Sequence, residues 1–159
     1  MKEIKITTNS SDETMNVAKS LAKLLNKGDT VVLTGDLGAG KTKFTEGFIS
    51  YYNLQDEISS PTFTIINEYS APISTIYHFD VYRLTDIDEF YAIGGEEYFD
   101  KGICLIEWGE LIEDALPPEN IRILFKIPNN GENSRILNIT ANGKKYEDIL
   151  QNLYDDLNK

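Results

Sequence analysis

The chain has 159 residues, which suits one ordinary domain with its own core but is short for an enzyme with a separate substrate domain. It carries 26 acidic and 15 basic residues, and its net charge of −11 argues against a surface that holds nucleic acid by neutralising phosphates. The single cysteine excludes an internal disulfide and a cysteine-rich metal site.

The composition also argues against export and against a membrane span. The first residues have no apolar signal core, and no window approaches eighteen consecutive apolar residues. Cys104 lies within an apolar run and is predicted to be a buried small side chain, which suits a reducing compartment. We therefore expect a cytoplasmic protein with one domain spanning residues 1–159.

The first thirty residues predict a strand, a helix and the start of a second strand. Residues 3–8 alternate charged and apolar side chains, as a half-exposed strand does. Ser10 and Glu13 have the spacing of a capping box, and the helix that they begin is predicted to continue to a stop at Gly28. The apolar run that starts at residue 30 predicts a buried strand.

The next stretch, residues 35–42, matches the phosphate-loop pattern of Gly, four residues, Gly, Lys and Ser/Thr. Its members are Gly35, Asp36, Leu37, Gly38, Ala39, Gly40, Lys41 and Thr42. Backbone N–H groups of such a turn, with the N-terminus of the helix that follows, form a cradle for phosphate oxygens. We expect Lys41 to contact the β- and γ-phosphates and the Thr42 hydroxyl to coordinate Mg²⁺.

A string typical of guanine recognition in GTPases, Asn-Lys-x-Asp, occurs at residues 26–29. In GTPases this string follows the phosphate loop by several elements. Here it closes a helix and precedes the phosphate-loop strand. We interpret it as coincidental and expect adenine to be the base.

A turn at residues 59–64 contains Thr62, and it leads into an alternating strand at 64–69. A hydroxyl on a loop near the phosphates can sense the γ-phosphate or position a water molecule. The alternative is an ordinary turn threonine.

The stretch at 73–84 is the next predicted strand, and it would point His78, Asp80 and Tyr82 to one face. The Asp80 carboxylate could there hold a Mg²⁺-bound water or accept a proton from the attacking water. His78 either orients Asp80 or is a core histidine.

Residues 86–100 predict two short acidic helices broken at Gly94 and Gly95. Their aromatic side chains either pack inward or, together with the acids, form a surface that binds a partner.

Four apolar residues at 103–106 run into Glu107, which is the Walker B pattern with Glu in the acidic position. Such a run suits a buried parallel strand beside the phosphate-loop strand, where Glu107 would reach the Mg²⁺ bound to Thr42. A surface carboxylate is the alternative. The rest of the chain predicts a helix at 111–116, strands at 121–127 and 135–139 with a hairpin at 129–131, and an amphipathic helix at 145–157.

The motifs at 35–42, 60–63, 78–84 and 106–108 occur in the order and approximate spacing of the TsaE family, also called YjeE, which the chain resembles closely. These are small bacterial ATPases required for threonylcarbamoyladenosine modification of tRNA, at position 37. The resemblance implies an α/β fold of the P-loop NTPase type, with a mostly parallel central sheet flanked by helices and an antiparallel C-terminal hairpin. It also implies Mg²⁺-dependent ATP hydrolysis, weak alone, in a complex with TsaB and TsaD that involves tRNA only indirectly.

The resemblance further assigns roles to individual residues. Thr42 and Glu107 would hold Mg²⁺, Thr62 would lie in a switch-like loop, and Asp80 would be the second essential carboxylate. The expected neighbours of the nucleotide are Trp108 beside it, with Ser11 and Arg135 bordering the adenine.

Two other functions remain open. A small-molecule or nucleotide kinase would usually need an arginine-bearing lid, for which Arg83 is a candidate, but no arginine-rich lid segment is evident. A nucleotide-dependent assembly switch would hydrolyse ATP almost undetectably until its partners bind.

Overall fold

The structure is a computed structural model that describes residues 1–36, 38–58, 65–129 and 132–159. The strands are β1 (Glu3–Thr8), β2 (Thr30–Gly35), β3 (Ile66–Ser70), β4 (Thr75–Asp80), β5 (Ile103–Glu107), β6 (Asn120–Lys126) and β7 (Arg135–Asn142). The helices are α1 (Ser11–Ala22), α2 (Lys41–Tyr51), α3 (Ile87–Ala92) and α4 (Lys144–Leu157), with short 3-10 helices η1 (Gln55–Glu57), η2 (Gly95–Tyr98) and η3 (Gly109–Ala115).

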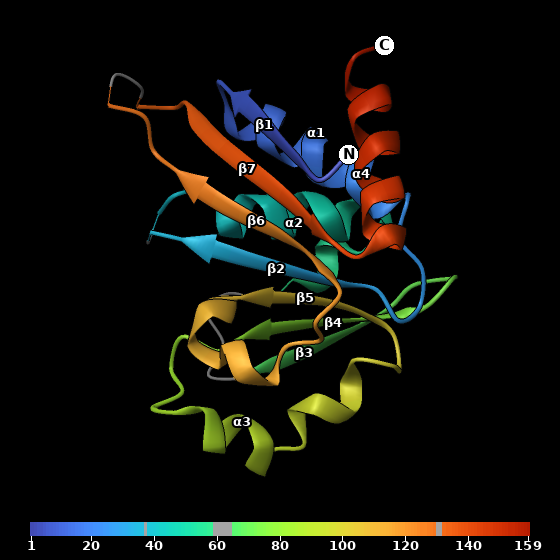
Figure 1. The fold of residues 1–159 in the computed structure, drawn as a ribbon, viewed down its shortest axis with the longest axis vertical. Helices are drawn as coiled ribbons and strands as arrows, with labels where there is room; N and C mark the ends of the chain where they lie inside the picture. Colours follow the sequence, from blue (N-terminus) through green and yellow to red (C-terminus); the bar gives the residue numbers. More distant parts are fainter. Residues whose placement is uncertain (37, 59–64, 130–131) are drawn as a thin grey trace.

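The strands form one seven-stranded sheet in the order β1-β7-β6-β2-β5-β4-β3 (Figure 1). Its centre is parallel, since β2 pairs with β6 and β5, and β5 pairs with β4. Both edges are antiparallel, through β1 with β7 and β6 with β7 on one side and β3 with β4 on the other. The predicted fold class and the antiparallel β6–β7 hairpin are confirmed, although residues 130 and 131 of its turn lie outside the described residues.

Both faces of the sheet are covered, which explains the apolar runs within the central strands β2 and β5. All five residues of β5 are buried, and β2 is buried until its last residue. One face packs against α1, α2 and α4, and the other packs against α3, η2 and η3, around the aromatic side chains of Phe79, Phe90 and Phe99. Fully burying an aliphatic or aromatic side chain contributes roughly 1.5–3 kcal/mol, so these two cores hold the sheet rigid beneath the site.

Helix α1 begins as predicted but ends earlier. The Ser10 hydroxyl accepts a hydrogen bond from the Glu13 N–H, as a capping box requires. The Glu13 carboxylate reaches back one residue further than in that motif and accepts from the Asn9 N–H. The predicted end at Gly28 is wrong, because the helix stops at Ala22. Tight turns follow, in which the N–H groups of Leu24 and Leu25 bond to carbonyls only three residues back.

The C-terminal ends of β2, β4 and β5 meet at one edge of the sheet because these strands are parallel. Strand β4 is shorter than predicted and ends at Asp80, so Tyr82 lies beyond the strand and not on its face. The short helix predicted at 111–116 is the 3-10 helix η3, which begins two residues earlier and ends at Ala115. In parallel α/β sheets this edge is where ligands bind.

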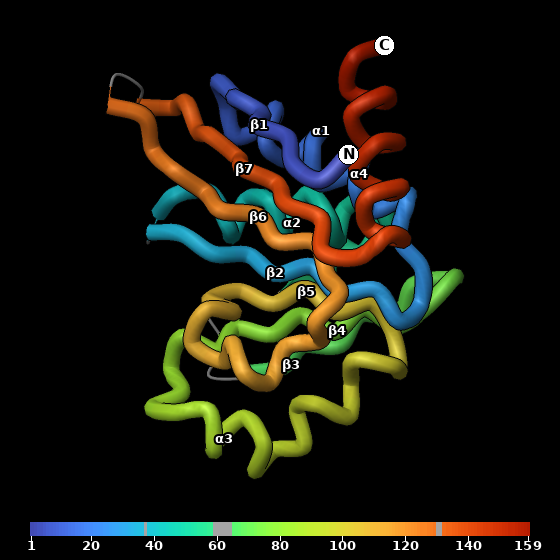
Figure 2. The backbone as a smooth tube through the Cα atoms, viewed as in Figure 1, coloured from blue at the N-terminus to red at the C-terminus, as the bar shows by residue number. Residues whose placement is uncertain are grey.

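The first residues of β1 lie beside α4 (Figure 2). In the part of the chain that the structure describes, no helix is both long enough and apolar enough to cross a membrane.

Candidate nucleotide site

The glycine-rich turn connects the end of β2 to the start of α2 at the ligand-binding edge of the sheet. Gly35, Gly38 and Gly40 all have positive φ angles, of 125°, 79° and 113°. A Cβ atom on Gly35 would lie 2.4 Å from the backbone oxygen of Phe125 on β6. Glycine is therefore required at the position where β2 leaves the sheet, and the turn can curl its N–H groups inward.

Lys41 is 5 % exposed and lies inside the turn. Its Nζ donates hydrogen bonds to the carbonyl oxygens of Gly35 at 2.5 Å and Asp36 at 2.9 Å. Burial lowers the pKa of Lys41 from its ordinary value, against the opposing effect of the carboxylates of Glu110, Glu107, Asp36 and Asp80. The ammonium group is thus held among negative charges at the place where phosphates would bind.

Trp108 follows β5 directly and adopts a left-handed conformation, with φ of 65°. Its N–H donates to the Leu33 carbonyl of β2 at 3.0 Å, which fixes the turn against the central strand. The Lys41 ammonium lies 4.0 Å from the centre of the Trp108 ring. The centre of the Tyr82 ring, in the segment that follows β4, lies 4.7 Å from the centre of the Trp108 ring. Trp108 therefore forms one wall of the site.

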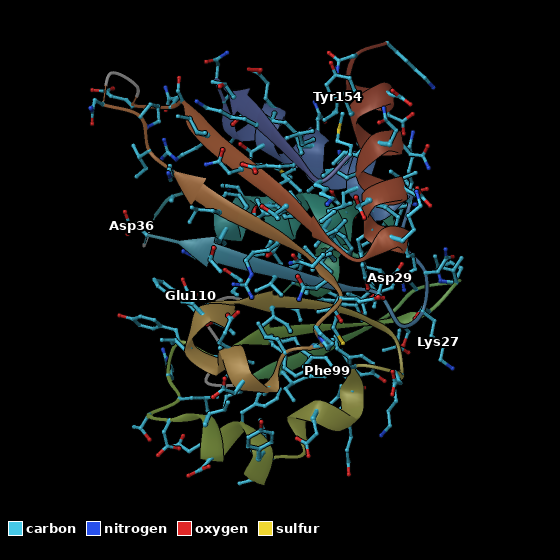
Figure 3. All side chains as sticks on the ribbon, viewed as in Figure 1. Lys27, Asp29, Asp36, Phe99, Glu110 and Tyr154 are labelled. Carbon is cyan, nitrogen blue, oxygen red and sulfur yellow. The ribbon has the colours of Figure 1, made fainter. Side chains whose placement is uncertain are left out.

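The turn at Trp108 also brings Glu110 to the site. Its carboxylate lies 3.5 Å from the Gly35 N–H, and Figure 3 shows Glu110 and Asp36 on the same side of the molecule. Sequence reasoning missed Glu110, since no motif or periodic pattern signals the left-handed turn that redirects the chain there.

The two expected carboxylates lie next to each other on neighbouring strands. Asp80 and Glu107 are register partners at the ends of β4 and β5. Asp80 is exposed, and its Oδ1 accepts a hydrogen bond from the Tyr82 N–H at 3.2 Å. Glu107 is buried, and its Oε2 lies 2.5 Å from His78 Nε2 and 3.5 Å from the Thr45 hydroxyl.

The contact of His78 differs from the alternative in which it orients Asp80, and its largely buried ring agrees with a core histidine. Its ring meets Glu107 and not Asp80, because Glu107 lies on the neighbouring strand diagonally opposite. Thr45 was also missed, although its position three residues after Thr42 places both on one side of α2 and could have indicated it.

Thr42 is exposed in the first turn of α2, and with Glu107 it offers a hydroxyl and a carboxylate oxygen. Over residues 1–36, 38–58, 65–129 and 132–159, no group of three or more His, Cys, Asp or Glu side chains could hold a metal ion. An all-oxygen set with few protein ligands suits Mg²⁺, which is usually bound through one or two carboxylates, water and substrate phosphates.

Arg135 lies against the glycine-rich turn. Its guanidinium donates to the carbonyls of Ser134 at 2.7 Å, Glu132 at 3.1 Å and Gly38 at 3.4 Å. Register pairs Arg135 with Thr8 at the end of β1, so the exposed Ser11 at the start of α1 lies near this corner of the sheet. Leu37 and Thr62 lie outside the described residues.

The guanine-like string has a structural role in this protein. The buried Asp29 carboxylate accepts from the Asn26 N–H at 2.7 Å and forms a 2.6 Å ion pair with Lys145 of α4. Figure 3 shows Lys27 and Asp29 at the opposite end of β2 from Asp36. These side chains are too far from the glycine-rich turn to read a base held there.

A central parallel strand that leads through such a turn into a helix, with an acidic strand end beside it, defines the phosphate-loop class of α/β proteins. A sequence model described as "Threonylcarbamoyl adenosine biosynthesis protein TsaE" matches residues 8–137. The chain belongs to the TsaE family.

Named relatives match nearly the whole chain. A tRNA threonylcarbamoyladenosine biosynthesis protein TsaE of Bacillus subtilis (strain 168) is 43% identical over 154 residues, covering 96% of this chain and 95% of that protein. The protein of the same name from Rickettsia conorii is 42% identical over 140 residues, covering 87% and 79%. The crystal structure of YdiB from Bacillus subtilis superposes with a TM-score of 0.78 at 38% identity, covering 98% of this chain and 96% of that one.

Proposed function

We propose that this protein binds ATP with Mg²⁺ and hydrolyses it in support of threonylcarbamoyladenosine modification of tRNA, in a complex with TsaB and TsaD. The observation that carries the proposal is the position of Lys41 in the glycine-rich turn. There its ammonium lies 4.0 Å from the Trp108 ring centre and interacts electrostatically with Glu107 at the end of β5. The names of the relatives point to the same tRNA modification.

The residues of the site divide the chemistry among them. The N–H groups of the turn and Lys41 would bind the phosphates, and Thr42 and Glu107 would hold Mg²⁺. Mg²⁺ bound there would offset the charge of the β- and γ-phosphates. Asp80, which is exposed at the neighbouring strand end, would orient the attacking water or accept its proton.

The charge balance supports a requirement for the metal. The carboxylates of four residues, Glu110, Glu107, Asp36 and Asp80, interact electrostatically with the Lys41 ammonium, so negative charge exceeds positive charge in this group of five side chains. A free triphosphate approaching these charges would be repelled, whereas its Mg²⁺ complex carries less negative charge. The net charge of −11 likewise supports an indirect connection to tRNA, through proteins and not through direct contact.

Dependence on partners agrees with the exposure of the site. Asp80 and Thr42 are both exposed, so water reaches the groups that would activate the nucleophile and hold the ion. Excluding water strengthens electrostatic stabilisation of a transition state, and a partner that covers these residues would supply this effect. We infer that the 159 residues form a single ATPase domain that acts in the cytoplasm. In this domain Trp108, Ser11 and Arg135 would lie beside the nucleotide, and Thr62 would lie in a switch-like loop.

Phosphate release measured without an added acceptor tests the proposal. The purified protein should release phosphate from ATP slowly, and adding TsaB and TsaD should accelerate release, while Lys41→Ala should abolish it. Release only with an added small-molecule acceptor would indicate a kinase. ATP-dependent assembly with TsaB and TsaD but no release would indicate a switch.

A further inference from the structure

We propose that His78 is a positioning residue that fixes the Glu107 carboxylate in the orientation needed for Mg²⁺-dependent nucleotide binding. The inference rests on the proposed function and assigns a role to a side chain outside its phosphate and metal contacts. The juxtaposition that supports it is the 2.5 Å contact between His78 Nε2 and Glu107 Oε2.

Both partners are withdrawn from water, with side-chain exposures of 13% for His78 and 8% for Glu107. A carboxylate so placed is costly without hydrogen-bond donors, and its ionised form can only accept. When the Glu107 carboxylate is ionised, His78 Nε2 is the donor in this contact. The contact replaces the water that a buried carboxylate loses.

The contact also selects between the two carboxylate oxygens. Glu107 Oε2 lies within reach of both His78 and the Thr45 hydroxyl. Among the hydrogen bonds formed between described residues, none engages Oε1. The single hydrogen of the Thr45 hydroxyl is donated to the Lys41 carbonyl at 3.0 Å, so His78 is the donor that anchors Oε2. This anchor restricts rotation of the carboxylate and leaves Oε1 for a cation.

The two side chains that lie against Oε2 come from separate elements. His78 lies on β4, which pairs with β5 in parallel, and Thr45 lies on α2, one turn beyond Thr42. The Glu107 carboxylate thus lies against the helix that would carry the other metal ligand. Outer hydrogen bonds of this kind commonly change metal affinity by roughly 10- to 100-fold.

The test compares His78→Gln and His78→Met, which have similar length but differ in whether they present a donor. ADP binding would be measured by calorimetry over a series of Mg²⁺ concentrations, so that no turnover is needed. His78→Met should raise the Mg²⁺ concentration for half-maximal binding about 10-fold or more. His78→Gln, whose amide can donate to Glu107, should stay within about threefold of the unmodified protein.

Lys145→Ala is the matched control, because it removes the partner of another buried carboxylate, Asp29, at the opposite end of β2. It should leave the Mg²⁺ dependence unchanged. Equal shifts in all three variants, or a shift below twofold in His78→Met, would overturn the positioning role. If the unmodified protein shows no Mg²⁺-dependent ADP binding, the proposed function fails as well.

A second measurement does not depend on any variant folding. His78 is the only histidine in the chain, so ¹⁵N-histidine labelling gives a single imidazole. Adding Mg²⁺ in the presence of ADP should move its ring signals, because the carboxylate that it contacts would then bind the ion. Unmoved ring signals at saturating Mg²⁺ would overturn the inference even though nucleotide binding itself was intact.

Discussion

Neutralising the two neighbouring carboxylates should separate metal binding from hydrolysis. In Glu107→Gln, the substitution removes a charge from a nearly water-free position. If the amide oxygen keeps the His78 contact, an NH₂ group also replaces the second oxygen, so a ligand atom is lost with the charge. The Mg²⁺ concentration for half-maximal ADP binding should therefore rise roughly 100-fold in Glu107→Gln, or about 2.8 kcal/mol. This is a larger rise than loss of the His78 contact alone should cause.

Asp80→Asn should behave differently because Asp80 is exposed and its hydrogen bond from the Tyr82 N–H can be kept by the amide oxygen. ATP binding should change little, while hydrolysis slows by roughly 10²- to 10⁴-fold if Asp80 is a general base and less if it only positions water. The assay is a Mg²⁺ titration of ADP binding and phosphate release in both variants. A large Mg²⁺ shift in Asp80→Asn with none in Glu107→Gln would refute the assignment.

Further predictions concern the lysine of the turn and the guanine-like string. Lys41→Ala should weaken ADP binding about 10-fold or more in calorimetry, and equal binding would contradict the phosphate-loop role. Because burial lowers the pKa of Lys41 and bound phosphates would favour its charged form, ADP binding should take up protons and weaken as the pH rises toward 10.5. Calorimetry in buffers of different ionisation enthalpy measures this uptake, which Lys41→Arg should lack. Asp29→Asn should lower the free energy of unfolding by about 1–2 kcal/mol in urea without altering the preference for ATP over GTP, and a change of base preference would reverse our interpretation of residues 26–29.

Local sequence patterns predicted the parts of the fold that depend on neighbouring residues. The buried strands β2 and β5 appear as apolar runs because each is covered on both faces, and the capping box at Ser10 is a contact within four residues. The end of α1 was missed because its apolar spacing continues through Leu24 and Leu25, which pack in the core after the helix has ended.

The position of a site residue could be predicted where a motif specifies both the residue and the strand or helix that carries it. The Walker B pattern predicted that Glu107 would end a strand beside β2, and register confirms that placement. The partners of Glu107 and Lys41 depend on strand order and on the turn at Trp108, which are properties of the whole sheet. His78 and Glu110 therefore acquire their contacts only when distant elements meet.

The central place of β2 has a consequence for synthesis of the chain. Thr30 pairs with Cys104, 74 residues later, and Val31 pairs with Ile121, 90 residues later. At a synthesis rate of about 5–20 residues per second, roughly 5–20 s pass between the synthesis of β2 and that of β6, its second neighbouring strand. Non-local parallel pairing is also slow to form, and unpaired strand edges promote aggregation. Fragments that stop before β6 should therefore precipitate, and nucleotide can assist folding only once nearly four-fifths of the chain has been made.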